Sequence, residues 1–278
     1  MLPLASWPLA ERRAIRGVMT DIDDTLTTDG AITADALQAL ADLRGAGLPV
    51  LAITGRSVGW SEPFALAWPV DAIVAENGAV LLQRSTPVGA AAGHPVLTKT
   101  YQQDAGTRQR HFTHMQRVAV RVLREVPGAH LAGDSWGRET DMAIDHSECH
   151  HLPTAAVERV VAIMGSEGMH ATVSSIHING WFGDHDKYQG ARWALRTLYG
   201  RELDAEAAQW VYVGDSTNDQ LMFQALPHSV GVANVRRFVE ALRHCPRFVT
   251  QEERGAGFAE VARAVLAARH SGHSGQPG

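Results

Sequence analysis

Short apolar runs that alternate with helical patterns set the strongest limit on what this chain can fold into. Residues 48–53 are apolar throughout, as expected of a strand that is covered on both faces, and residues 72–75 repeat this pattern in a shorter form. Three further segments are predicted to be strands, and these are 15–19, 210–213 and 230–232. Strands that alternate with helices form βαβ units, so the pattern predicts an α/β fold with a parallel sheet.

The middle of the chain departs from this alternation. Residues 171–179 alternate clearly between two faces and are predicted to form one strand, with His177 and Asn179 on the same face. Around it lie two more strand-like segments and two helical ones, which are 96–101, 140–144, 107–125 and 153–164. This mixture predicts a separate α+β module.

The domain organisation follows from these two patterns. We predict a catalytic core formed by residues 1–84 and 185–278, interrupted by an inserted α+β module over residues 85–184. Residues 271–278 contain only Gly, Ser, His, Gln and Pro and are predicted to be a disordered tail.

The composition limits the kinds of partner that the protein is expected to bind. The formal net charge of the 278 residues is −5, so we expect no general attraction to nucleic acid or to an anionic membrane. Cys149 and Cys245 lie far apart and outside any CxxC motif, so no disulfide framework is expected. The N-terminal segment has no basic stretch followed by an apolar run, and no run reaches transmembrane length, so we expect a cytoplasmic protein. The oligomeric state stays open.

Polar clusters follow three of the predicted strands. Asp21, Asp23 and Asp24 come directly after the first strand, where carboxylates close to the core repel one another unless a cation compensates them. Each cluster taken alone is typical of turns. Together they stand at equivalent strand ends, where open α/β sheets bind ligands. The other members are Thr54-Gly55-Arg56, Gly214-Asp215-Ser216-Thr217-Asn218-Asp219 and Lys187, which opens a predicted helix.

The series D-x-D-x-T, T-G-R, Lys and G-D-x-x-N-D resembles the motifs of the haloacid dehalogenase (HAD) superfamily. Glu76-Asn77-Gly78-Ala79, with an inserted module before the lysine, is similar to its Cof-type branch, subfamily IIB. That branch contains sugar-phosphate phosphatases, including sucrose-phosphate and mannosyl-phosphoglycerate phosphatases, and also phosphomannomutases. The resemblance implies an α/β fold with a HAD-like Rossmannoid parallel sheet core and an inserted α+β cap domain of the C2B type.

The chemistry of the residues agrees with this resemblance. Asp21 and Asp215, from two strand ends, can hold one hard cation through oxygen, and Mg²⁺ suits such a site because it binds few carboxylates and keeps other oxygen ligands. The resemblance implies that the backbone carbonyl of Asp23 is a third ligand. It further implies that Asp21 is the nucleophile that forms an aspartyl-phosphate and that the Asp23 side chain transfers protons. Asp24 is interpreted as a turn or cap residue.

The same resemblance implies the phosphate contacts. Thr54 would donate its hydroxyl and Gly55 its amide, Ile22 would line the phosphate site, and Lys187 would pair with the phosphate and with Asp21. Asn218 and Asp219 resemble residues that orient metal-bound water and the lysine, with Asn218 also beside the substrate and direct metal ligation by Asp219 left open.

Four residues are candidates for contact with the rest of the substrate, namely Arg56, Asn77, His177 and Asn179. For His177 and Asn179 the alternative is a pair of cross-strand surface contacts. The fourteen histidines lack an HExxH or CxxC motif, so a zinc site is disfavoured.

The resulting hypothesis is a Mg²⁺-dependent phosphatase that hydrolyses a small phosphorylated metabolite, most readily a sugar phosphate. The inserted module would exclude water and select the leaving group. Two alternatives stay open at this point: a phosphomutase with the same core, and a non-catalytic sugar-phosphate-binding protein.

Overall fold

The computed structural model describes residues 1–85 and 95–270, and the predicted disordered tail therefore lies outside the described residues. The described residues fall into two compact units. The first contains Met1–Ile53, Ala67–Ile73 and the chain from Ala191 onward, and the second contains Thr54–Leu66 and Val74–Gly190. The predicted module boundaries, 85 and 184, are not tested by this division and stay predictions.

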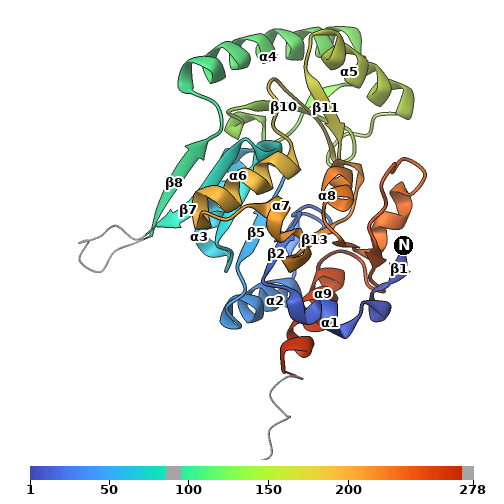
Figure 1. The fold of residues 1–278 in the computed structure, drawn as a ribbon. Coiled ribbons are helices and arrows are strands. Elements are labelled where there is room, and N and C mark those ends of the chain that lie inside the picture. Colours follow the sequence, from blue (N-terminus) through green and yellow to red (C-terminus); the bar gives the residue numbers. More distant parts are fainter. Residues whose placement is uncertain (86–94, 271–278) are drawn as a thin grey trace, which may run out of the picture. The chain divides into compact units, whose positions relative to one another are not determined.

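A parallel sheet forms the centre of the first unit (Figure 1). Its strands lie in the order β1 (Leu2–Pro3), β15 (Phe248–Val249), β14 (His228–Gly231), β13 (Trp210–Gly214), β2 (Gly17–Thr20) and β5 (Val50–Ile53). Every residue of β14, β13, β2 and β5 is buried, as expected of parallel strands that are covered on both faces. The predicted α/β fold with a parallel sheet is confirmed.

Helices cover the sheet of the first unit and complete its core. They are α1 (Leu9–Ala14), α2 (Ala34–Gly45), α7 (Leu203–Glu206), α8 (Gln220–Ala225) and α9 (Arg254–His270). A two-stranded ribbon, β3 (Thr27–Thr28) with β4 (Ala31–Ile32), follows β2. Two elements cross the division between the units: β6 (Ala72–Ala75) and α6 (Lys187–Tyr199).

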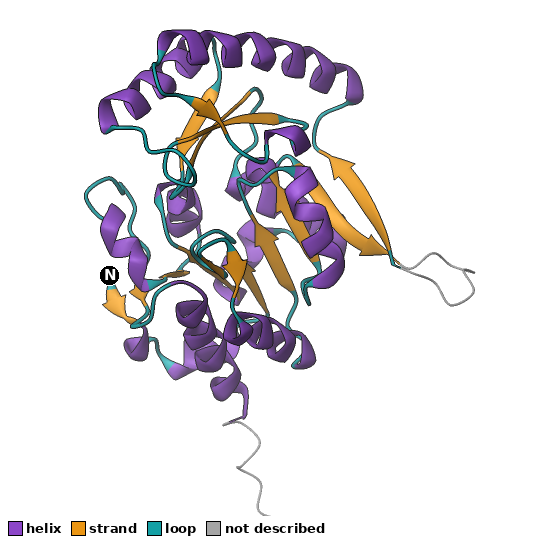
Figure 2. Cartoon of the chain, turned by 180° about the vertical axis from the view of Figure 1, so that it is seen from behind, coloured by secondary structure: helices purple, strands orange, loops and turns teal. Residues whose placement is uncertain are grey.

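The second unit is α+β. Its antiparallel sheet has the order β11 (His170–Val173), β12 (His177–Trp181), β10 (Asp141–Asp145) and β9 (His130–Leu131). Two helices, α4 (Ala105–Glu125) and α5 (Thr154–Ser166), lie on one side of these strands (Figure 2). Met115 and Val122 of α4, Ile163 of α5 and Ile144 of β10 share one buried apolar cluster there. Burial of these faces holds helices and sheet together. The unit also contains α3 (Val58–Ala67), β7 (Val80–Ser85) and β8 (Val96–Tyr101).

The single strand predicted over residues 171–179 is wrong, because the segment is the hairpin β11–β12. The Ser174 side chain makes the turn: its hydroxyl accepts the backbone N–H groups of Ile176 and His177, at 3.3 and 3.0 Å. Serine can replace backbone partners in this way without a Gly or Pro signal in the sequence. His177 and Asn179 nevertheless lie in β12, two positions apart, and share a face as predicted.

Within the described residues, no helix combines the length and the apolar character needed to cross a bilayer. The cytoplasmic location stays a prediction.

Candidate active site

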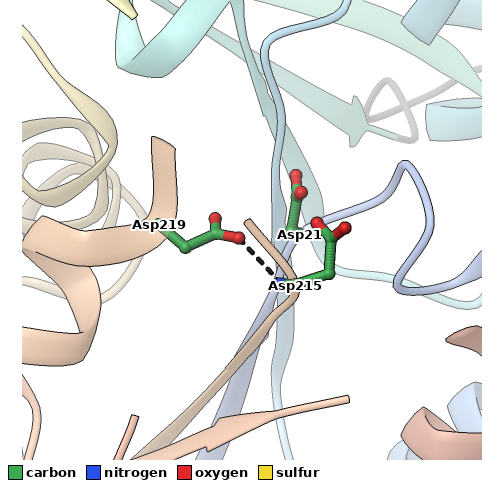
Figure 3. Close-up of side chains that lie close together, drawn as sticks. All are labelled: Asp21, Asp215 and Asp219. Atoms are coloured by element: carbon green, nitrogen blue, oxygen red, sulfur yellow. Dashed lines mark hydrogen bonds between the residues drawn. The ribbon is translucent and has the colours of Figure 1, made fainter. Parts of the chain in front are cut away.

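Three buried aspartates of the first unit form an acidic cluster, which comprises Asp21, Asp215 and Asp219 (Figure 3). Each offers a carboxylate oxygen, and these oxygens all lie within 4.8 Å of one another. Asp21 follows β2 and Asp215 follows β13, and these strands are neighbours in the sheet. The Asp21 backbone N–H donates to the Val213 carbonyl at 2.8 Å, which continues the ladder to the strand ends. The parallel pairing thus delivers both side chains to one edge, as predicted.

Asp219 holds the loop that carries Asp215. Its Oδ2 accepts the backbone N–H groups of Asp215 and Ser216, at 2.9 and 3.0 Å, and its Oδ1 accepts the Tyr212 hydroxyl. Figure 3 shows its carboxylate turned toward the Asp215 backbone nitrogen. A Cβ atom at Gly214 would lie 2.5 Å from Asp219 Oδ2, so this approach requires glycine. These contacts favour the orienting role of Asp219 over direct metal ligation.

The pKa of the Tyr212 hydroxyl reflects burial and the negative charge of the acidic cluster. Burial raises the pKa of Tyr212 well above its ordinary value, and the carboxylates of Asp219, Asp21 and Asp215 raise it further. A neutral phenol is therefore the donor to Asp219, and a positive charge would be stabilised here.

Asn234 was not predicted from the sequence. Its Nδ2 donates to Asp215 Oδ2 at 3.1 Å and to the Asp24 carbonyl at 3.0 Å, and its Oδ1 accepts the Arg254 backbone N–H at 3.0 Å. One signal could have found it: Asn234 stands just beyond β14, the neighbour of β13 in the sheet, where the strand-end argument also applies.

The structure gives Asp24 a local structural role. It has a positive φ of 53° and its Oδ1 lies 3.1 Å from Arg254 Nε. Aspartate tolerates this left-handed conformation better than most residues, as expected in a turn. Arg254 also binds Asp29 Oδ1 at 2.8 Å.

The remaining predicted residues of the first unit lie on the same two loops. Ile22 is buried, and its carbonyl accepts the Leu26 backbone N–H at 2.9 Å, which shapes the loop after β2. Asp23 is half-buried on that loop. Asn218 is buried and accepts the Ser216 hydroxyl at 2.9 Å.

The second unit begins with the T-G-R motif. Thr54 follows β5 directly, and its backbone N–H donates to the Val74 carbonyl at 2.9 Å. The Thr54 carbonyl accepts the Asn77 backbone N–H at 2.9 Å, and its Oγ1 accepts the Arg56 backbone N–H at 3.0 Å. The T-G-R loop is therefore fixed against the Glu76-Asn77-Gly78 turn.

The helix that begins at Lys187 packs against the same turn. Lys187 is buried at the start of α6, and this end of the helix packs against Gly78, where a Cβ atom would collide with the Asp186 carbonyl. Gly190 makes the matching close approach to Gly78 from the next helical turn. The two glycines thus bring the lysine-bearing helix to the segment that holds Thr54.

The four candidate substrate contacts are also brought together within the second unit. Glu148 Oε1 binds Arg56 at 2.7 Å, and its Oε2 lies 2.8 Å from His177 Nε2. Asn179 Nδ2 donates to the Gly55 carbonyl and to Asp141 Oδ2, each at 3.0 Å.

Beside the T-G-R loop lies a buried ionic network whose acidic residues were not predicted from the sequence. Arg138 donates to the Gly55 carbonyl at 3.1 Å and pairs with Asp134 at 2.9 Å and with Asp141 at 2.6 Å. Asp141 also lies 3.4 Å from Asn77 Nδ2. No short motif marks Asp134 and Asp141, because their pairing with Arg138 forms only in the folded chain.

The acidic cluster fits a divalent cation by its donor chemistry. Three buried carboxylates this close repel one another, and a hard ion with oxygen ligands relieves that repulsion. Asp21 and Asp215 would hold it directly.

A parallel sheet with acids at the ends of adjacent strands is the arrangement expected of a haloacid dehalogenase-like hydrolase. Comparisons with known proteins agree with this class. Residues 18–92 match the family model of haloacid dehalogenase-like hydrolases. The predicted resemblance to the HAD superfamily is confirmed. Comparison with curated protein sequences finds no match.

Solved structures share the fold over nearly the whole chain. A protein from Thermoplasma acidophilum, number 0175, has a TM-score of 0.66 and 20% identity, with 91% of this chain and 98% of that chain covered. The sucrose-phosphatase of Synechocystis sp. PCC6803, solved with sucrose and phosphate, has a TM-score of 0.62 and 16% identity, with the same coverage of 91% and 98%. The HAD subclass IIB sugar phosphatase BT4131 has a TM-score of 0.58 and 14% identity, with 92% and 99% covered.

Proposed function

We propose that this protein is a Mg²⁺-dependent phosphatase that hydrolyses a small phosphorylated metabolite, and that the metabolite is a sugar phosphate. The observation that carries the proposal is the acidic cluster, in which Asp21 and Asp215 meet at the ends of neighbouring parallel strands. A bound cation would keep Asp21 ionised and offset the charge of the phosphate oxygens.

Asp21 is the nucleophile in this proposal. Its carboxylate forms a bond to phosphorus while the bond from phosphorus to the ester oxygen breaks, and Asp23 donates a proton to that leaving oxygen. Asp23 then accepts a proton from water as the water attacks phosphorus, the aspartyl-phosphate opens, and phosphate leaves. The partial exposure of Asp23, beside the buried Asp21, supports this division of roles.

Thr54, Gly55 and Lys187 bind the phosphate in the proposed reaction. Support comes from the second unit, where the T-G-R loop and the start of α6 are both fixed against the Glu76-Asn77-Gly78 turn. A buried lysine contributes positive charge where negative charge develops.

The α+β part of the second unit contributes substrate selection as the predicted cap. The support is that Arg56, Asn77, His177 and Asn179 join through Glu148 and Asp141 around the T-G-R loop. Sugar phosphates are proposed because two proteins of the same fold are named as sugar or sucrose phosphatases.

Phosphate release from a panel of sugar phosphates, phosphoglycerates, nucleotides and pyridoxal phosphate tests this function. We expect release that requires added Mg²⁺ and stops with EDTA. Conversion of a hexose 1-phosphate into the 6-phosphate without free phosphate would instead identify a phosphomutase. Binding without any turnover across the panel would identify a non-catalytic sugar-phosphate-binding protein.

A further inference from the structure

The Glu148 carboxylate is shared between two residues that the sequence marks as substrate contacts. Oε1 lies 2.7 Å from Arg56 and Oε2 lies 2.8 Å from His177. The Arg56 and His177 side chains are 5% and 2% exposed, whereas that of Glu148 is 27% exposed. The two basic groups are therefore buried behind an acid that still faces outward in part.

Asp145 holds Glu148 in this position. One buried Asp145 oxygen accepts the backbone N–H groups of Ser147 and Glu148, at 3.1 and 2.9 Å. The other accepts those of Cys149 and His150, at 2.9 and 3.0 Å. Four backbone donors on one carboxylate fix the loop, so Glu148 is a built feature and not a mobile surface acid.

Both arginines that touch the T-G-R loop carry carboxylate partners. Arg56 belongs to the loop and is paired with Glu148, and its guanidinium also lies 4.8 Å from the centre of the Trp60 ring. Arg138 donates to the Gly55 carbonyl and is paired with Asp134 and Asp141. The charges of Arg56 and Arg138 are thus already balanced by the protein's own acids.

This balance has a consequence for the leaving group of a phosphate ester. An anionic group brought to Arg56 or His177 meets the charge of Glu148 and must displace it, which is unfavourable when the acid is half-buried. A hydroxyl group meets no such repulsion and can donate to the remaining lone pairs of Glu148. The arrangement therefore disfavours anionic leaving groups and accepts leaving groups that carry hydroxyls.

We propose that Glu148 is a specificity-determining residue that makes this enzyme select phosphate esters with an uncharged, hydroxyl-bearing leaving group and reject those with a carboxylate. This inference rests on the proposed phosphatase function and narrows its substrate class. Glycerol 3-phosphate and 3-phosphoglycerate provide the probe pair, because they share a three-carbon skeleton and differ in a hydroxymethyl group against a carboxylate.

The experiment compares kcat/KM for the two probes in the wild-type protein and in Glu148→Gln, which keeps the side-chain shape and removes the charge. We expect the wild type to favour glycerol 3-phosphate, and the ratio in Glu148→Gln to move about tenfold or more toward 3-phosphoglycerate. Glu148→Ala, checked for folding by circular dichroism, should move the ratio in the same direction.

Glu167 offers a matched control in the same unit. Its carboxylate also joins an arginine and a histidine, Arg121 at 2.5 Å and His114 at 3.3 Å, and among the described residues no ion pair links it to the T-G-R loop. Glu167→Gln should leave the ratio unchanged.

The possible outcomes distinguish failure of this inference from failure of the proposed phosphatase function. If the wild type hydrolyses neither these probes nor any ester of the wider panel, the phosphatase function fails. If it hydrolyses both probes but prefers the carboxylate ester, or if the Glu148 variants lose activity equally on both, only the role of Glu148 is overturned. An equal loss would mean that the residue acts in structure alone.

Discussion

The acidic cluster of the first unit and the ionic network of the second gather buried charge in opposite ways. In the cluster, three carboxylates lie within 4.8 Å of one another, and the donors identified around them include the neutral groups of Asn234 and Tyr212. In the network, carboxylates alternate with arginines, so that Arg138 lies between Asp134 and Asp141.

The difference indicates which region a cationic ligand would stabilise. Like charges in a cluster are stabilised by something brought to them, which suits a place where a cation and a phosphate arrive. Alternating charges compensate one another and hold a geometry without a ligand. In the proposed function the first region binds the cation, whereas the second holds the T-G-R loop of its own unit in shape.

Replacement of Asp21, the proposed nucleophile, should have the largest effect. Asp21→Asn keeps the shape of the side chain but removes the attacking charge, and turnover should fall by about four orders of magnitude or more. Phosphate release under saturating Mg²⁺ measures this, with circular dichroism as a check on the fold. Asp29→Asn, on an exposed acid that binds Arg254, is the control and should retain activity. Substantial turnover in Asp21→Asn would disprove the mechanism.

Breaking the network should cost stability with or without a ligand. Arg138→Met leaves Asp134 and Asp141 buried without their arginine, and the free energy of unfolding should fall by about 3–5 kcal/mol. Urea titration measures the loss, which added Mg²⁺ should not restore. Arg124→Met removes an exposed pair with Glu125 and should change stability by less than about 1 kcal/mol. Equal effects of the two variants would mean that burial of the network does not matter.

Much of the fold follows from sequence because its signals are local. The segments 72–75 and 96–101 coincide with β6 and β8, and Lys187 opens α6, since an apolar run or a helical period is enough to mark them. The β11–β12 hairpin was missed because a serine hydroxyl makes its turn, and that contact depends on a folded partner.

The candidate site likewise contains residues that could be predicted from the sequence and residues that could not. Asp21 and Asp215 were found because parallel strands carry their ends to one edge, a rule that needs no side-chain contact. Asn234, Glu148 and Asp141 were not found, because their relevance comes only from what they touch. Charge partners recruited from distant loops leave no periodic or spaced pattern in a sequence.

Replacement of Asn234 tests whether the acidic cluster binds Mg²⁺. Asn234→Ala removes the donor to Asp215 Oδ2 and leaves that carboxylate less well oriented. The Mg²⁺ concentration for half-maximal activity should rise by about 10–100-fold, the scale of lost support around a metal ligand. High Mg²⁺ should restore most of the rate. A reduced rate that no Mg²⁺ concentration improves would place Asn234 outside metal binding.

We expect the smallest effect from acid titration of Glu148, the carboxylate that is paired with Arg56 and His177 in the second unit. Hydrogen bonds from His177, followed by Arg56, lower the pKa of Glu148 from 4.5 to about 2. The unfolded chain therefore takes up this proton at higher pH than the folded protein does. The Glu148 contribution to the free energy of unfolding is complete above about pH 4.5 and is lost as the pH falls toward 2. The glutamine in Glu148→Gln cannot titrate, so the stability difference between wild type and variant should shrink with acidification over this range. Because the carboxylate is partly exposed, solvent screening keeps the change modest. Urea titrations of both proteins at several pH values measure it, and parallel pH profiles would show that Glu148 is not held by charge.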